Sequence, residues 1–200
     1  MTTAVSKLFL ALMLLVGFCA LPACNKDDPG AAANALFKQA NTTDNLKGLA
    51  DAILKAQEAG ELERAAALTN HLIFDDGMLK KIFKADVPGK FLTEQGGRLK
   101  LFPTTQAELA TLIRRGSPTR TQINVHGATT EEIQAFLAGT PANEAVKEFA
   151  QMPKDFAANL RPGITFYQVE FVDPGKSAGI KYHMFTWDGS RWRMLGPGWR

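Results

Sequence analysis

The sequence has few of the residues that usually carry covalent or metal chemistry. It contains two cysteines, Cys19 and Cys24, both near the N-terminus, and only three histidines. The histidines, His71, His126 and His183, lie far apart and show neither HExxH nor any other metal-ligand spacing. The sequence therefore predicts no metal site, and we expect no cofactor.

The motifs of common enzyme classes are also missing. There is no GxSxG nucleophile elbow, no Walker phosphate loop and no dinucleotide-binding fingerprint. This pattern favours a binding protein over an enzyme. The formal net charge is only +3, which is too small to indicate a nucleic-acid-binding protein. We therefore expect no nucleic-acid partner.

Long apolar runs are confined to the N-terminus. The run from Leu8 to Leu21 carries no charge and follows Lys7. It is too short to span a bilayer comfortably, because a transmembrane helix needs about 20 apolar residues. A basic start, a short apolar region and a small residue before a cleavage site are typical of a signal peptide. Residues 1–23 are therefore predicted to be removed on export.

The end of this segment, Leu21-Pro22-Ala23-Cys24, resembles the lipobox of bacterial lipoproteins. The resemblance implies cleavage before Cys24 and attachment of diacylglycerol to its thiol, so that the membrane itself is a partner. Pro22 departs from the family pattern, which usually has a small residue there. Asn25 follows the cysteine, and by the sorting pattern of such proteins this favours the outer membrane of a double-membraned bacterium. We expect an exported protein anchored to the cell envelope.

The cysteine count agrees with this interpretation. Cleavage before Cys24 discards Cys19 and leaves one cysteine in the mature chain. A lone free thiol is a liability in an oxidising compartment, whereas an acylated cysteine is not. Two alternatives stay open at this point, namely an ordinary secretory signal with an incidental cysteine and an uncleaved membrane anchor.

After processing, residues 24–33 are predicted to form a tether and residues 34–200 a single domain. Apolar periodicity predicts helices over much of 34–85. Capping-box pairs, Thr105 with Glu108 and Thr129 with Glu132, predict further helices over 105–115 and 129–137. Helices are also expected over 143–152 and 156–160, a turn at 95–97 and a short strand over 98–102.

The strongest strand signals lie in the C-terminal third. Residues 164–172, 180–187 and 191–195 predict an antiparallel meander, and 121–125 an earlier strand. Placing Val172 opposite Gly179 sets Glu170 opposite Lys181 and Gln168 opposite His183. The predicted fold class is therefore α+β, with N-terminal helices followed by a mostly C-terminal antiparallel sheet.

This order of elements resembles the cone of nuclear-transport-factor-2-like domains. The resemblance implies a small-molecule-binding or hydrolytic pocket, in which His183 would act as an acid or base beside Glu170 or Gln168. The alternative for His183 is a hydrogen-bonded structural residue on a half-wet sheet face. The C-terminal tail, with Trp187-Asp188-Gly189, is also similar to that of uncharacterised exported bacterial proteins.

Arginine and tryptophan alternate in this tail, at Arg191, Trp192, Arg193 and Trp199. Such residues suit a partner protein or an anionic envelope component, through charge and stacking. Alternatively, the arginines keep an edge strand from pairing with other chains while the tryptophans complete the core. From sequence alone we expect a lipid-anchored envelope protein with a binding role, and the pocket-forming domain is the alternative.

Overall fold

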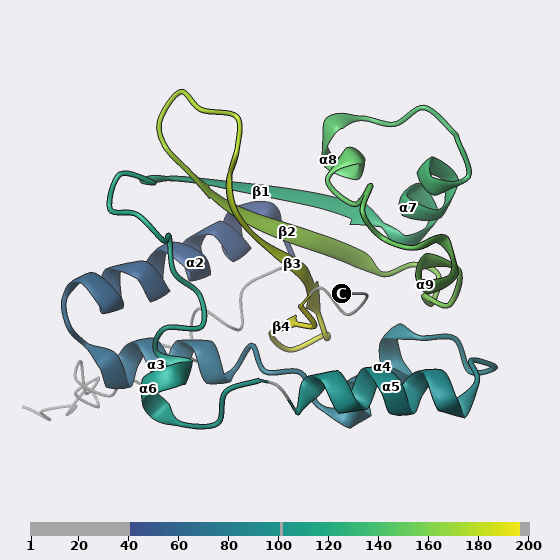
Figure 1. Cartoon of the computed structure of the whole chain (residues 1–200), viewed down its shortest axis with the longest axis horizontal. Helices are drawn as coiled ribbons and strands as arrows, with labels where there is room; N and C mark the ends of the chain where they lie inside the picture. Colours follow the sequence, from purple (N-terminus) through teal and green to yellow (C-terminus); the bar gives the residue numbers. More distant parts are fainter. Residues whose placement is uncertain (1–40, 101, 197–200) are drawn as a thin grey trace, which may run out of the picture.

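The computed structural model describes residues 41–100 and 102–196. Its helices are α2 (Thr43–Glu58), α3 (Leu62–Asn70), α4 (Asp76–Ile82), α5 (Gly89–Leu99), α6 (Gln106–Leu109), α7 (Thr130–Leu137), α8 (Glu144–Lys147) and α9 (Lys154–Ala158). Its strands are β1 (Gln122–Thr129), β2 (Thr165–Val172), β3 (Gly179–Trp187) and β4 (Trp192–Met194). Helices thus precede a mostly C-terminal sheet, and the predicted α+β class is confirmed (Figure 1).

The strands form one antiparallel sheet in the order β1-β2-β3-β4. The predicted meander and the earlier strand are both present, although β1 extends to Thr129 and β4 is short. Gly179 lies opposite Val172 and Lys181 opposite Glu170, as predicted. The alternation of side chains therefore predicted the hairpin register correctly from Gly179 to Lys181.

A β-bulge then changes the register between β2 and β3. His183 and Met184 of β3 both lie opposite Gln168, which replaces the predicted one-to-one pair of Gln168 with His183. Met184 adopts a φ of 60°, a left-handed conformation that is uncommon for a residue with a side chain. Its side chain is fully buried, so the surrounding core holds this conformation in place.

The bulge also changes which residues of β3 share a face. By simple alternation, Phe185 and Trp187 would lie on the same face of β3 as Lys181, and Tyr182 would lie on the other face. Instead, Phe185 and Trp187 pack in the same core as Tyr182, because the extra residue reverses the alternation.

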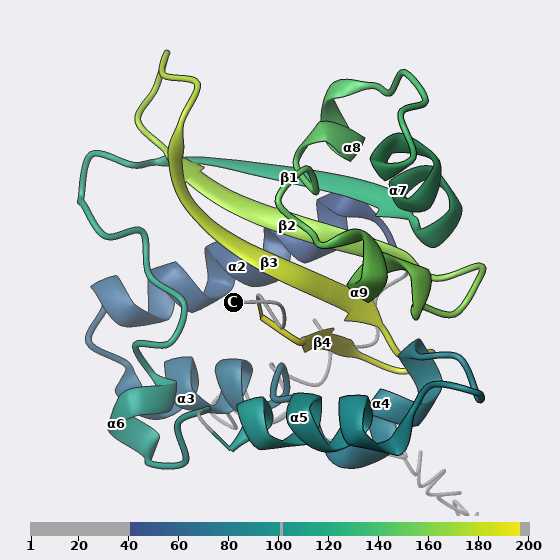
Figure 2. The same cartoon turned by 45° about the vertical axis from the view of Figure 1, so that its right-hand side comes forward.

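The sheet separates two hydrophobic cores, and helices cover both faces (Figure 2). On one face, Ile53 of α2 packs with Val169 and other inward side chains of the sheet. On the other face, Ile133 of α7 and Phe156 of α9 pack with Phe166. Helices α7, α8 and α9 therefore gather over one end of this second face.

The segment over 95–102 differs from the sequence prediction of a turn and a strand. Helix α5 runs through Gly96 and Gly97 to Leu99. Phe91 packs edge-on against Phe83, with ring centroids 5.1 Å apart, and such burial outweighs the roughly 1 kcal/mol that a helical glycine costs. A Cβ on Gly96 would lie 3.2 Å from a side-chain oxygen of the exposed Asp76, so that side chain would have to shift slightly.

The capping boxes give the correct helix starts but not always the correct lengths. Thr129 and Glu132 form the complete capping box of α7. Thr105 caps α6, which ends at Leu109 rather than near 115. The early end of α6 is explained by Gln57. Its side-chain amide donates to the carbonyl oxygen of Ala110 at 2.8 Å and to that of residue 113 at 2.5 Å. These two carbonyls therefore have hydrogen-bond partners without a continuing helix. Helix α8 is likewise shorter than predicted, whereas α9 has the predicted length but begins two residues earlier.

Candidate functional site

Of the aromatic residues predicted to contact a ligand, Trp192 lies inside the fold. Its side chain is 0 % exposed and packs edge-on against Tyr167 and Trp187, with ring centroids 5.1 and 5.5 Å away. This placement matches the alternative in which the tail tryptophans complete the core. Trp199 and Cys24 lie outside the described residues.

Arg193 is also turned into the protein, with a side chain that is only 8 % exposed. Its Nε donates to Asp188 Oδ2 at 2.9 Å, and its Nη1 donates to the carbonyl oxygen of Ile73 at 2.7 Å. Its Nη2 lies 3.6 Å from Asp75 Oδ2. The guanidinium therefore ties the β3–β4 turn to the segment between α3 and α4, and the structure gives it a full set of internal partners.

The carboxylate of Asp188 organises the same turn. Burial opposes its ionisation, but hydrogen bonds from Arg193, Ser190 and the backbone N–H of Arg191 lower the pKa of Asp188 to about 2. Arg191 lies further out, with Nη1 3.5 Å from His71 Nδ1. Burial and then the charges of Arg191 and Arg193 lower the pKa of His71. Among the described tail residues that were predicted to contact a ligand, Arg191 is therefore the most accessible.

Polar side chains gather on the second sheet face beside the bulge at His183. We call Glu148, Gln168, Glu170 and Lys181 the sheet-face cluster. Lys181 Nζ donates to Glu148 Oε2 at 2.5 Å and lies 3.6 Å from Glu170 Oε1, while Gln168 Nε2 donates to the same Glu148 oxygen at 2.7 Å. Glu170, 3 % exposed, also accepts from the backbone N–H of Gly179 at 3.0 Å. Each charge of the cluster thus has an opposite charge within reach.

The electrostatics of this cluster hold its members in their charged forms. Burial opposes ionisation of Glu148, but hydrogen bonds from Lys181 and Gln168 outweigh it and lower the pKa of Glu148. Burial likewise opposes the charge of Lys181, but its hydrogen bond to Glu148 and the charges of Glu148 and Glu170 raise the pKa of Lys181.

Three cavities formed by described residues are lined by residues other than His183.

Lys181→Met is expected to destabilise the fold by about 2 kcal/mol, because it leaves the nearly buried carboxylate of Glu170 beside that of Glu148 without their shared ammonium. The same change should raise the pKa of Glu148, measured by carboxyl NMR titration. Lys176→Met, in the exposed β2–β3 turn, is the matched control and should change neither quantity. An unchanged Glu148 titration in Lys181→Met would contradict the assigned interaction.

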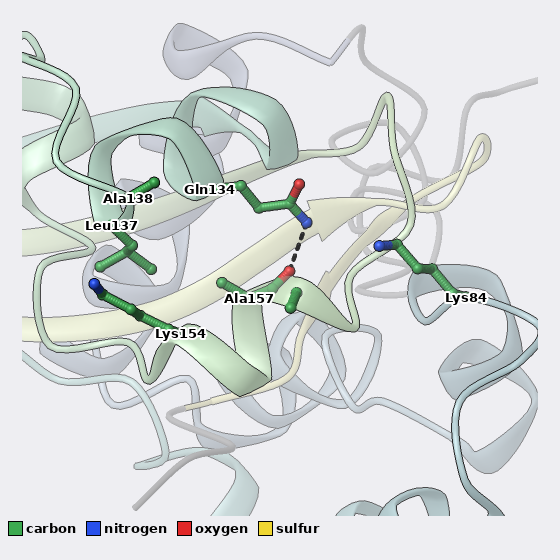
Figure 3. Close-up of a pocket in the computed structure, with 7 residues that line it drawn as sticks. Lys84, Gln134, Leu137, Ala138, Lys154 and Ala157 are labelled. Carbon is green, nitrogen blue, oxygen red and sulfur yellow. Dashed lines mark hydrogen bonds between the residues drawn. The ribbon is translucent and has the colours of Figure 1, made fainter.

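A hollow of about 290 Å³ lies between α7 and α9, beside the chain that follows α4 (Figure 3). We call it the lysine groove. Lys84 and Lys154 lie at its opposite ends in the close-up, and small apolar side chains lie between them. It is lined by Lys84, Gln134, Leu137, Ala138, Lys154, Ala157 and Ala158.

Backbone pairing places the two lysines, which are far apart in the sequence, along the same groove. Phe83 forms an antiparallel bridge with Leu160, and the backbone N–H of Lys84 donates to the carbonyl oxygen of Asn159 at 2.9 Å. The side-chain amide of Gln134 donates to the carbonyl oxygen of residue 157 at 2.7 Å and so joins α7 to α9 (Figure 3). The walls of the groove are therefore fixed by hydrogen bonds.

Neither lysine of the groove has an ion-pair partner among the described residues. Two unpaired ammonium groups at the ends of an apolar hollow suit an anion that also carries apolar atoms. Neither residue belongs to a sequence motif, so this arrangement was not predictable from the sequence. The groove is the candidate binding site that the described part of the chain supports best.

Comparison with known proteins finds no matching family model and no significant similarity to a curated protein or to a solved structure. Within residues 41–100 and 102–196, no group of three or more His, Cys, Asp or Glu side chains could hold a metal ion. No helix in that part of the chain is both long and apolar enough to cross a membrane.

Proposed function

We propose that this chain is an exported lipoprotein, anchored to the cell envelope through Cys24, whose α+β domain binds an anionic envelope component. The observation that carries the proposal is Leu21-Pro22-Ala23-Cys24 at the end of an uncharged apolar run. The predicted tether, residues 24–33, is short enough to hold the domain close to the bilayer. The outer membrane is the favoured site in a double-membraned bacterium because Asn25 follows the cysteine.

The lysine groove supports anionic phospholipid headgroups as the bound component. The hydroxyl of Tyr167, near the start of β2, donates to the carbonyl oxygen of Asn41 at 3.5 Å, so the chain enters the domain at that end of the sheet. Helix α7 begins at the same end, where Thr129 pairs with Thr165. The chain enters on the face covered by α2 and the groove lies on the other face, so the two share only this end of the sheet. A short tether keeps that end near the membrane surface, where phosphate would meet ammonium and glycerol would meet the apolar lining.

Binding is favoured over catalysis by the electrostatics of the polar groups near His183. A general acid or base works best with a pKa near the operating pH. In the sheet-face cluster, the pKa of Glu148 is lowered and that of Lys181 is raised, both away from neutrality. These groups suit a structural role on the sheet better than proton transfer.

A vesicle-binding measurement tests the role of the groove. The mature chain, residues 24–200 carrying Cys24→Ser so that no lipid is attached, is mixed with vesicles of phosphatidylglycerol or phosphatidylcholine. We expect binding to phosphatidylglycerol only, and the double variant K84A/K154A should weaken it about 30-fold, at about 1 kcal/mol for each lysine near an anionic surface.

The matched control removes the same charge from a neighbouring hollow. Lys80 and Lys100 line a cavity against α4 and α5, and K80A/K100A should leave vesicle binding within about twofold of the wild-type chain. Equal losses in the two double variants would mean that net charge, rather than the groove, drives binding. Equal binding to the two kinds of vesicle would contradict recognition of an anionic headgroup.

A further inference from the structure

The two edge strands of the sheet, β1 and β4, differ in how they are covered. Strand β4 is covered by the segment after α3, because the backbone N–H of Met194 donates to the carbonyl oxygen of Leu72 at 2.7 Å and Met194 forms a parallel bridge with Ile73. Arg193 adds a side-chain hydrogen bond to the carbonyl oxygen of Ile73. Other chains are therefore kept from pairing with this edge.

The opposite edge, β1, has helices α2 and α8 packed against it, but its sequence and register carry no charge, proline or bulge that would prevent strand pairing. It is the outermost strand in both views (Figures 1 and 2), and its eight residues pair with β2 in continuous register without a bulge. Its sequence, QINVHGAT, contains no charged residue and no proline. Long, regular and uncharged edge strands are templates for pairing with a further strand.

Hydrogen bonding at the end of β1 shows which backbone groups face outward. The backbone N–H of Thr130 donates to the carbonyl oxygen of Ile164 at 2.8 Å, in line with the β1–β2 register. Bonded and non-bonded pairs alternate along an antiparallel ladder, so the even-numbered residues of β1 bond to β2. The odd-numbered residues then direct their N–H and C=O groups away from β2. Thr129 agrees, because its N–H is accepted outside the ladder by Glu132 Oε2 at 2.8 Å.

Ile123, Val125 and Gly127 are the remaining odd-numbered residues of β1. Among the described residues, their backbone groups have no hydrogen bond outside the β1–β2 pair. They form a row of outward donors and acceptors along the outer edge of the sheet, in regular strand geometry. This row is the pattern that an additional antiparallel strand requires.

We propose that the outer edge of β1 pairs with β1 of a second copy of the chain, about a twofold axis at Val125, so that the two four-stranded sheets become continuous. Val125 then lies opposite the partner's Val125, and Ile123 opposite the partner's Gly127. Each such pair exchanges two hydrogen bonds, which gives about six across the axis.

The composition of β1 favours a second copy over an unrelated strand. Identical strands place identical charges near one another about a twofold axis, and β1 has no charge to repel its copy. In the proposed register, Asn124 lies opposite the partner's His126, which pairs two hydrogen-bonding side chains on one face. Val125 and Ile123 supply apolar side chains on the other face. A slip of one residue would place polar residues against the apolar face.

Val125→Pro tests the backbone contact with little effect on the fold. Proline removes the outward N–H of Val125 and leaves the ladder with β2 intact. We expect the dimer of the full chain in detergent to dissociate about 10- to 100-fold more readily, measured by sedimentation, with an unchanged circular dichroism spectrum. Val125→Thr keeps the N–H and is the control that should remain dimeric.

Disulfide trapping in cells tests the register independently. Residues 124 and 126 form a non-hydrogen-bonded pair across the axis, a spacing that allows a disulfide. N124C/H126C should give a reducible dimer on gels, while neither single cysteine variant does so, because each then faces the partner's unsubstituted residue. A wild-type chain that sediments as a monomer would overturn the proposal. The proposal would also be overturned if V125P stayed dimeric and N124C/H126C gave no reducible product. A reducible product that contained a different protein would overturn it as well.

Discussion

Asp188→Ala is expected to lower the free energy of unfolding by about 3 to 5 kcal/mol. The carboxylate is 4 % exposed and pairs with the guanidinium of Arg193, which is 8 % exposed. Alanine would leave that guanidinium buried without its carboxylate, and Asp75 is a poor substitute because it lies 3.6 Å away and is 59 % exposed. The loss is a large part of the 5 to 15 kcal/mol that stabilises a typical domain.

Urea denaturation of the wild-type and variant proteins measures this effect. Asp173→Ala, in the turn between β2 and β3, is the matched control and should cost less than about 1 kcal/mol, because the hydrogen bond to Lys176 uses only the backbone carbonyl of Asp173. A loss below about 1 kcal/mol in Asp188→Ala would show that the Arg193 contact contributes little.

The same carboxylate predicts a pH dependence of stability. Its pKa is lowered from an ordinary 3.8 to about 2 in the folded chain, so the unfolded chain binds the proton more readily. The contribution of Asp188 is therefore complete above about pH 4 and is lost as the pH falls toward 2, with a size of about 2 kcal/mol. Asp188→Ala should remove this part of the pH dependence in urea titrations between pH 7 and pH 2.5.

Local side-chain alternation was sufficient to predict the hairpin up to its bulge. Glu170 and Lys181 are opposite each other as predicted, and both contribute to one electrostatic cluster. The prediction for His183 is wrong in its pairing, because the bulge depends on the burial of Met184 in a core built from distant helices. A period of two residues contains no information about an inserted residue.

Other errors have the same origin in tertiary contacts. Gly96 and Gly97 indicate a turn by local propensity, yet packing of Phe91 against the second core keeps α5 helical. The lysine groove depends on the bridge that joins the segments around residues 83 and 160, so its two lysines line one hollow only in the folded chain. Helix starts were predictable because a capping box is local, as Thr129 shows.

Cys24→Ser is expected to abolish lipid attachment to the chain. The thiol of Cys24 is the proposed site of the diacylglyceryl group, so Cys24→Ser removes the atom to which the lipid is attached. We expect complete loss of covalent lipid from the chain, since no other cysteine follows residue 24. Cys19→Ser is the matched control, because Cys19 belongs to the predicted signal peptide and leaves the mature chain on cleavage.

Labelling of growing cells with radioactive palmitate, followed by isolation of the chain, tests the central claim most directly. The anchored lipoprotein predicts label in the wild-type chain and in Cys19→Ser, and none in Cys24→Ser. Label that persists in Cys24→Ser, or its absence from the wild-type chain, would contradict the proposed anchor.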